Sequence, residues 1–217
     1  MTVESNNSLV VDFNLYLITD RKQVAGGDLC LALEGALRGG VRAVQLREKD
    51  LNSRELFDLA CRLRGLTSRY GAKLLINDRL DIAMAVGADG VHLGESSMPV
   101  ERVREIAGDG MFIGVSCHCL SGAVAAREGG ADFITFSPVY HTPSKAGYGD
   151  PVGTERLAEA CRLLRMPVFA LGGIKPENVR AVMGHGAHGI ALISAILAAQ
   201  DPEAAAREIL SLLNRKV

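Results

Sequence analysis

Three polar side chains alternate at the end of one apolar run, in the sequence Gln45-Leu46-Arg47-Glu48-Lys49. On a strand, residues two positions apart point to the same side, so Gln45, Arg47 and Lys49 would face one space. An amphipathic strand with a solvated polar face is the alternative, but a strand covered by helices has no such face. We therefore predict that these three residues bind an anion.

A carboxylate follows another apolar run, in the pair Asn77-Asp78. The pair could be a turn that caps a helix. Opposite two cations, however, Asp78 could hold a divalent metal that bridges to a polyphosphate, because magnesium commonly sits on one or two carboxylates and on substrate oxygens. The expected position of Asp78 opposite Arg47 and Lys49 favours the metal site over a helix cap.

The elements that must position these residues alternate along the chain. Residues 53–70 show apolar side chains at three- and four-residue steps, which is typical of a helix with one buried face. Short apolar runs between such segments predict eight strands: Leu15–Thr19, Ala43–Arg47, Lys73–Ile76, Gly90–Leu93, Phe112–Ser116, Phe133–Ser137, Val168–Leu171 and Gly189–Ile193. Eight such units predict a single (β/α)8 TIM barrel over residues 1–217, with residues 1–14 as a short N-terminal extension.

In such a barrel the carboxyl ends of the strands form the functional face. Gly172-Gly173 and Ser194 follow the last two predicted strands, where barrels often seat a phosphate monoester, and Pro176 predicts a helix start. The loop 137–153 follows the sixth strand and supplies Thr142, Ser144 and Lys145. We predict that this loop closes over a phosphorylated ligand, the alternative being a solvated surface loop.

Charge and composition exclude several classes of partner. Lysine and arginine number 24 against 25 acidic residues, so no basic surplus is present to bind nucleic acid. The five cysteines are odd in number and predict free thiols. No run approaches the roughly 20 apolar residues of a membrane span, so we expect a cytoplasmic protein without a membrane partner. The expected partners are small phosphorylated molecules, and the chain could form a homodimer.

Seven segments resemble, in order, the motifs of the thiamine phosphate synthase family. They are "LYLITDR", "VQLREKD", "LLINDRLDIAMAVGADGVHLG", "IGVSCH", "TPSK", "ALGGI" and "ISAIL", spread from about Leu15 to Leu197. The resemblance implies a barrel enzyme that uses Mg²⁺. It would condense 4-amino-2-methyl-5-hydroxymethylpyrimidine pyrophosphate with 4-methyl-5-hydroxyethylthiazole phosphate, giving thiamine phosphate and pyrophosphate.

The resemblance also implies roles for individual residues. The pyrimidine pyrophosphate would be held by Gln45, Arg47, Lys49, Asn77, Ser116 and Lys145. Of these, catalysis would rest on Arg47, Lys49, Ser116 and Lys145. The thiazole phosphate would be held by Thr142, Ser144, Gly173, Ile193 and Ser194. Asp78 and Ser97 would occupy the two positions at which the family carries its metal ligands.

The chain departs from the family pattern after the fourth strand. Family members usually read Gly-Gln-Glu-Asp there, with the aspartate as a second metal ligand, whereas this chain reads Gly94-Glu95-Ser96-Ser97. Glu95 or Glu48 could replace the missing carboxylate.

Two alternatives to the synthase remain open on the sequence. The related thiazole tautomerase group carries similar serine-bearing loops, but its catalytic histidine would fall at Pro138, which leaves His118 and His141 as acid–base candidates. A barrel that binds thiamine precursors without catalysis is the second alternative.

Overall fold

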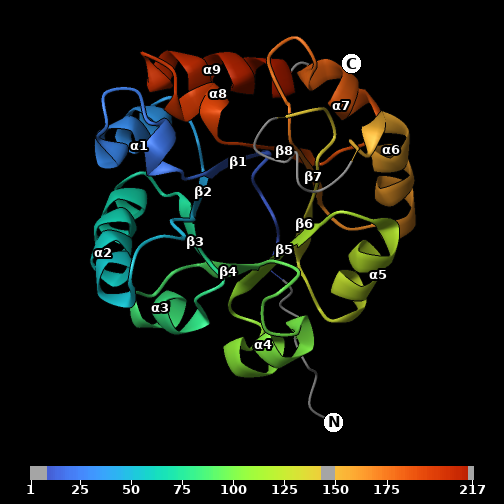
Figure 1. The fold of residues 1–217 in the computed structure, drawn as a ribbon, viewed down its shortest axis with the longest axis horizontal. Helices are drawn as coiled ribbons and strands as arrows, with labels where there is room; N and C mark the ends of the chain where they lie inside the picture. The colour runs from blue at the N-terminus through green and yellow to red at the C-terminus, as the bar shows by residue number, and fades with distance from the viewer. Residues whose placement is uncertain (1–8, 143–149, 215–217) are drawn as a thin grey trace.

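The structure, a computed structural model, describes residues 9–142 and 150–214. Eight parallel strands close into a barrel in chain order, and the helices form a ring outside them (Figure 1). The strands are β1 (Leu15–Ile18), β2 (Ala43–Leu46), β3 (Lys73–Asn77), β4 (Gly90–Leu93), β5 (Phe112–Cys117), β6 (Phe133–Phe136), β7 (Val168–Leu171) and β8 (Gly189–Leu192). This closed sheet confirms the predicted (β/α)8 TIM barrel.

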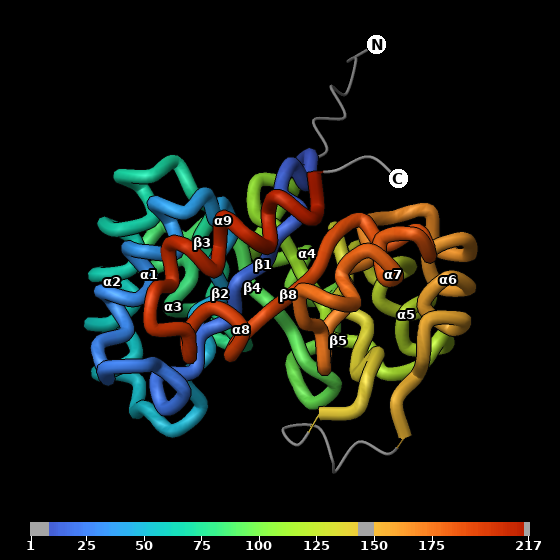
Figure 2. The backbone as a smooth tube through the Cα atoms, turned by 90° about the horizontal axis from the view of Figure 1, so that it is seen from above, coloured from blue at the N-terminus to red at the C-terminus, as the bar shows by residue number. Residues whose placement is uncertain are grey.

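The helices cover the outer face of the sheet. Figure 2 shows α1, α2 and α3 on one side of the barrel and α5, α6 and α7 on the other. Their bounds are α1 (Leu29–Arg38), α2 (Ser53–Arg69), α3 (Leu80–Ala85), α4 (Val100–Ala107), α5 (Leu120–Glu128), α6 (Gly153–Leu164), α7 (Val179–Gly184), α8 (Ser194–Leu197) and α9 (Pro202–Leu213). A short 3₁₀ turn, η1 (Arg21–Gln23), follows β1.

Local chemistry sets the start of α2, which lies next to the candidate site. The Asn52 side chain accepts a hydrogen bond from the Glu55 backbone, and the Glu55 side chain accepts one from the Asn52 backbone. This reciprocal pair satisfies two backbone donors that the first helical turn would otherwise leave without partners. It therefore fixes where the loop after β2 ends.

The start of α7 differs from the prediction. The sequence places a helix start near Pro176, but α7 begins at Val179. Asn178 explains the delay, because its Oδ1 accepts from the Lys175 backbone and its Nδ2 donates to the Gly173 carbonyl. These bonds close a separate turn over residues 173–178 before the helix begins.

Four predicted strand ends lie one residue beyond the observed strands. They are Thr19, Arg47, Ser137 and Ile193. Thr19 still continues the ladder, since its backbone N–H donates to the Gln45 carbonyl at 2.9 Å. Its side chain then accepts from the Arg47 backbone N–H at 2.9 Å, which ties the loops after β1 and β2 together.

Two apolar layers hold the barrel. The larger lies between the sheet and the helices, and the smaller fills the barrel interior. Phe13, from the segment predicted as an N-terminal extension, belongs to the inner layer and is only 4% exposed. Its ring centroid lies 5.3 Å from that of Phe169 and 5.7 Å from that of Phe133. The segment before β1 therefore contributes to the core.

We expect Phe13→Ala to lower the free energy of unfolding by about 3–5 kcal/mol, because truncating a buried phenylalanine loses its contacts and leaves a cavity. Urea unfolding followed by circular dichroism measures the change. Val10→Ala is the matched control, since Val10 is 76% exposed in the same segment and should change stability by less than about 0.5 kcal/mol. Equal stability of wild type and Phe13→Ala would contradict the role of Phe13.

Among the described residues, no helix is both long enough and apolar enough to cross a membrane.

Candidate active site at the carboxyl ends of the strands

Three adjoining hollows lie at the carboxyl ends of the strands. We call them the central, carboxylate and glycine hollows, with volumes of about 460, 320 and 480 Å³. Lys49 and Asn77 line both the central and the carboxylate hollow, and Leu171 and Ile193 line both the central and the glycine hollow. The hollows are therefore neighbours in one row across the barrel mouth.

The central hollow brings together most residues predicted to bind an anion. Gln45 lines it from β2, Arg47 and Lys49 from the loop that follows β2, Asn77 from β3 and Ser116 from β5. Within the described residues, no carboxylate pairs with Arg47 or Lys49, whereas the nearby Arg21 and Lys22 both pair with Asp50. The two cations that face the hollow thus retain their charge for a bound anion.

An ion network holds the loop that carries these cations. The Arg21 guanidinium bonds to Asp50 and to Glu48, and the Arg21 backbone N–H also donates to Glu48, at 3.0 Å. The Arg21 hydrogen bond, aided by Lys22, holds the pKa of Asp50 well below its ordinary value. The Glu48 side chain is only 3% exposed. Glu48, between Arg47 and Lys49, is therefore engaged in an ion pair with Arg21, although it also lines the carboxylate hollow.

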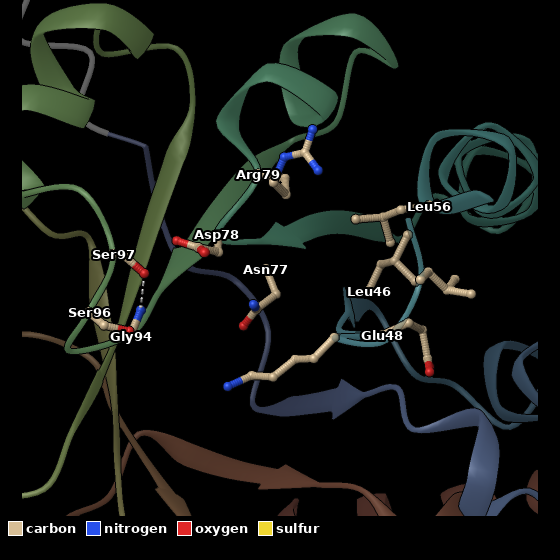
Figure 3. Close-up of a pocket in the computed structure, with 11 residues that line it drawn as sticks. Leu46, Glu48, Leu56, Asn77, Asp78, Arg79, Gly94, Ser96 and Ser97 are labelled. Atoms are coloured by element: carbon tan, nitrogen blue, oxygen red, sulfur yellow. Dashed lines mark hydrogen bonds between the residues drawn. The ribbon is translucent and has the colours of Figure 1, made fainter. Parts of the chain in front are cut away.

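The carboxylate hollow contains Asp78. Its φ of 65° places this residue in the left-handed region, which aspartate and asparagine tolerate better than most residues. The Asp78 backbone N–H donates to the His92 carbonyl at 2.9 Å, which anchors this unusual conformation. In Figure 3 the Asp78 carboxylate points toward the turn that carries Gly94 and Ser97, while the Glu48 carboxylate points away.

The Ser97 hydroxyl holds that turn closed. It accepts a hydrogen bond from the Gly94 backbone N–H at 2.8 Å (Figure 3). Glu95 lines the central hollow and not the carboxylate hollow. Among the described residues, no group of three acidic, histidine or cysteine side chains is placed to hold a metal ion. Of the two carboxylates that line the carboxylate hollow, Asp78 is thus the one that points toward this turn.

One carboxylate is nevertheless compatible with magnesium, which binds with few protein ligands and completes its shell from water and phosphate oxygens. Arg79 does not neutralise Asp78 directly. Its guanidinium pairs with Asp81 and bonds to Ser53 Oγ, and this pairing lowers the pKa of Asp81 below its ordinary value. The donor set of the carboxylate hollow therefore fits a loosely held magnesium ion.

The glycine hollow contains Thr142, Gly173, Ile193 and Ser194. Gly173 has a φ of 67°, and a Cβ there would lie 2.7 Å from Tyr140 Cβ and 2.8 Å from the His141 carbonyl oxygen. Only glycine fits both the conformation and the space. Asn178 fixes the same loop through its bond to the Gly173 carbonyl. The exposed residues Lys175 and Glu177 also line the glycine hollow.

The two histidines considered as acid–base groups lie in different hollows. His118 lines the central hollow, and its Nδ1 donates to the Ser137 carbonyl at 2.6 Å. His141 lines the glycine hollow and is exposed.

Two predicted residues cannot be placed. Ser144 and Lys145 lie outside the described residues, so their roles stay predictions. Sequence reasoning also missed a set of buried groups below the central hollow. Tyr16 and His92 form hydrogen bonds to Gln45 and Ser116, two residues of the hollow.

Residues 15–196 match the family model described as thiamine monophosphate synthase. The chain belongs to this family. A Clostridium novyi thiamine-phosphate synthase is 40% identical over 199 residues, which are 92% of this chain and 98% of that protein. A Geobacter sulfurreducens protein is 61% identical over 203 residues, 94% of this chain and 95% of its own, and its name gives thiamine-phosphate synthase as a provisional function.

A solved structure, the thiamine phosphate pyrophosphorylase from Pyrococcus furiosus, is also similar. It is 37% identical, covers 92% of this chain and 95% of its own, and superposes with a TM-score of 0.84. Family membership thus confirms the resemblance seen in the motifs, and it favours the synthase over the tautomerase and over a protein that only binds precursors.

Proposed function

We propose that this barrel joins 4-amino-2-methyl-5-hydroxymethylpyrimidine pyrophosphate to 4-methyl-5-hydroxyethylthiazole phosphate, with release of pyrophosphate. The observation that carries the proposal is the row of three hollows, in which the central one shares residues with both neighbours. Two substrates seated in adjoining hollows would meet at Ile193 and Leu171. This arrangement supplies the proximity that a bimolecular condensation requires.

The central and carboxylate hollows would hold the pyrimidine pyrophosphate. Gln45 and Ser116 line the floor, where the ring would lie. Arg47, Lys49 and Asn77 are then available to the pyrophosphate, with Lys145 as a second cationic anchor. Thr142, Gly173, Ile193 and Ser194 would hold the thiazole phosphate in the glycine hollow, and Ser144 is proposed to bind the same phosphate.

The proposed chemistry begins with cleavage of the bond between the pyrimidine methylene carbon and the pyrophosphate oxygen. The electron pair leaves with the pyrophosphate, and Arg47 and Lys49 stabilise the growing negative charge. The thiazole nitrogen then donates its lone pair to the methylene carbon. Asp78 would hold a magnesium ion against the pyrophosphate, and the ion would neutralise part of its charge. The Ser97 hydroxyl, already bonded to Gly94, would add only a weak neutral ligand.

Supplying both substrates with magnesium tests the proposal. We expect thiamine phosphate and pyrophosphate to form in equal amounts, measured by chromatography and by a coupled phosphate assay. With the thiazole tautomer alone, the ultraviolet spectrum should change only at the spontaneous rate, because a synthase needs no acid–base group for tautomerisation. Faster tautomerisation without condensation would support the tautomerase, and binding without turnover would support the precursor-binding protein.

A further inference from the structure

A continuous line of hydrogen bonds crosses the barrel just below the central hollow. Gln45 Nε2 donates to the Tyr16 hydroxyl at 3.1 Å, and that hydroxyl lies 3.4 Å from His92 Nδ1. His92 Nε2 lies 3.0 Å from Ser116 Oγ, and the Thr135 hydroxyl donates to the same oxygen at 3.3 Å. Tyr16, Gln45, His92 and Thr135 are each at most 1% exposed. The line therefore joins two residues of the hollow through groups shielded from water.

The strand register builds this line. Ser116 pairs with Thr135 across β5 and β6, and His92 pairs with Gly114 across β4 and β5. Gly114 provides the space, since a Cβ there would lie 2.5 Å from His92 Nδ1. The His92 ring also packs against the rings of Tyr16 and Phe133, with centroids 5.6 and 5.8 Å away. The position of His92 is thus fixed by packing as well as by hydrogen bonds.

The direction of each hydrogen bond follows from its neighbour. An amide nitrogen can only donate, so the Tyr16 oxygen accepts from Gln45 and its proton points to His92 Nδ1. Burial raises the pKa of Tyr16 far above its ordinary value, which keeps that proton in place. A neutral His92 that accepts at Nδ1 carries its own proton on Nε2 and donates to Ser116. Ser116 Oγ accepts from both His92 and Thr135, so its proton is directed elsewhere.

This order leaves two groups of opposite character at the floor of the hollow. Gln45 Oε1 has no hydrogen-bond partner among the described residues, and it can only accept. Ser116, with both acceptor positions used, can only donate. A ligand edge that fits must present one donor to Gln45 and one acceptor to Ser116.

We propose that Tyr16 and His92 are positioning residues that make the floor of the central hollow specific for a 4-aminopyrimidine edge and exclude the 4-oxo analogue. The exocyclic amino group of a 4-aminopyrimidine donates and its ring nitrogen accepts, which matches the floor. A 4-oxopyrimidine presents an oxygen and a ring N–H. Its oxygen would face Gln45 Oε1, so that two acceptors meet, and its ring N–H would face the Ser116 O–H, so that two donors meet. The ligand part of this inference rests on the proposed function.

The hydrogen-bond order is tested first, in the wild-type protein without substrate. Two-bond ¹H–¹⁵N correlation spectra of ¹⁵N-histidine-labelled protein report which ring nitrogen carries the proton, and His92→Gln assigns the His92 signal among the five histidines. We expect a neutral His92 protonated at Nε2. A ring protonated at Nδ1 would overturn the inference, whatever the enzyme does.

Selection between the two bases is tested with Tyr16→Phe, which removes one hydroxyl and keeps the aromatic ring. We expect the ratio of kcat/KM for the 4-amino substrate to that for its 4-oxo analogue to fall at least about tenfold, because the Gln45 amide is then free to turn. Phe13→Leu is the matched control, since Phe13 packs on Tyr16 with ring centroids 5.8 Å apart but makes no bond to the line. Its ratio should stay unchanged.

An unchanged ratio in folded Tyr16→Phe would overturn the selectivity. A wild type that condenses neither pyrimidine would instead overturn the proposed function, while the histidine spectra would still decide the hydrogen-bond order.

Discussion

Arg47→Ala is expected to lower kcat/KM for condensation by about 10- to 100-fold while the protein folds normally. A charge-assisted hydrogen bond to a phosphate contributes roughly 1.5–3 kcal/mol, and Arg47 has no competing carboxylate among the described residues. Arg47→Lys should recover only part of the loss, because an ammonium group cannot reproduce a two-pronged contact. Steady-state kinetics with varied pyrimidine pyrophosphate measure the effect.

Lys22→Ala is the matched control for removing a positive charge at the barrel mouth. Lys22 pairs with Asp50 at 2.8 Å, its side chain is 69% exposed, and it lines none of the three hollows. It should retain full activity. If Arg47→Ala were as active as Lys22→Ala, the central hollow would not bind the pyrophosphate.

The barrel could be predicted because its signals are local. Each strand is a short apolar run, and each helix repeats its buried positions every three or four residues, as in α2. The strand limits were less accurate at Asn77 and Cys117, which extend β3 and β5 by one residue. Polar residues at a strand end look like loop in the sequence, and only the neighbouring strand decides whether their backbone is paired.

The residues that line the hollows could be predicted for a related reason. In a closed parallel sheet, every strand ends at the same rim, so Gln45, Asn77 and Ser116 had to come together. The line of hydrogen bonds through Tyr16 and His92 could not be predicted, because it depends on which residues face each other across neighbouring strands. Asn77 pairs with His92 and Ser116 with Thr135, and this register is absent from the sequence pattern.

Glu48 shows how an ion pair that depends on the fold is missed in the sequence. In the sequence it is a carboxylate between two predicted anion-binding residues, which made it a candidate metal ligand. Its partner Arg21 lies 27 positions earlier, after β1, and the ion pair forms only when β1 and β2 lie side by side. The same pairing leaves Arg47 and Lys49 as the cations of the central hollow.

The carboxylate hollow yields the second large effect. Asp78→Asn should reduce magnesium affinity by at least about 10- to 100-fold. Mutating a residue that only hydrogen-bonds to a metal ligand commonly lowers metal affinity by that factor, and Asp78 would be a direct ligand. Asparagine is the suitable replacement, since it tolerates the left-handed backbone at φ 65° where alanine would add strain. Asp58→Asn removes the same charge from an exposed side chain that pairs with Arg54 and lines none of the three hollows, so it should respond to magnesium as the wild type does.

Ser97→Asp should move the response in the other direction. Asp78 and Ser97 line the same carboxylate hollow, so a carboxylate in place of the Ser97 hydroxyl adds negative charge there. A hard cation such as magnesium prefers charged oxygen ligands. The half-saturating magnesium concentration should therefore fall in Ser97→Asp and rise in Asp78→Asn. Pyrophosphate release against magnesium concentration measures both shifts, and calorimetric titration of magnesium with pyrophosphate present measures binding without turnover. Identical magnesium curves for wild type, Asp78→Asn and Ser97→Asp would show that the metal is not held in this hollow.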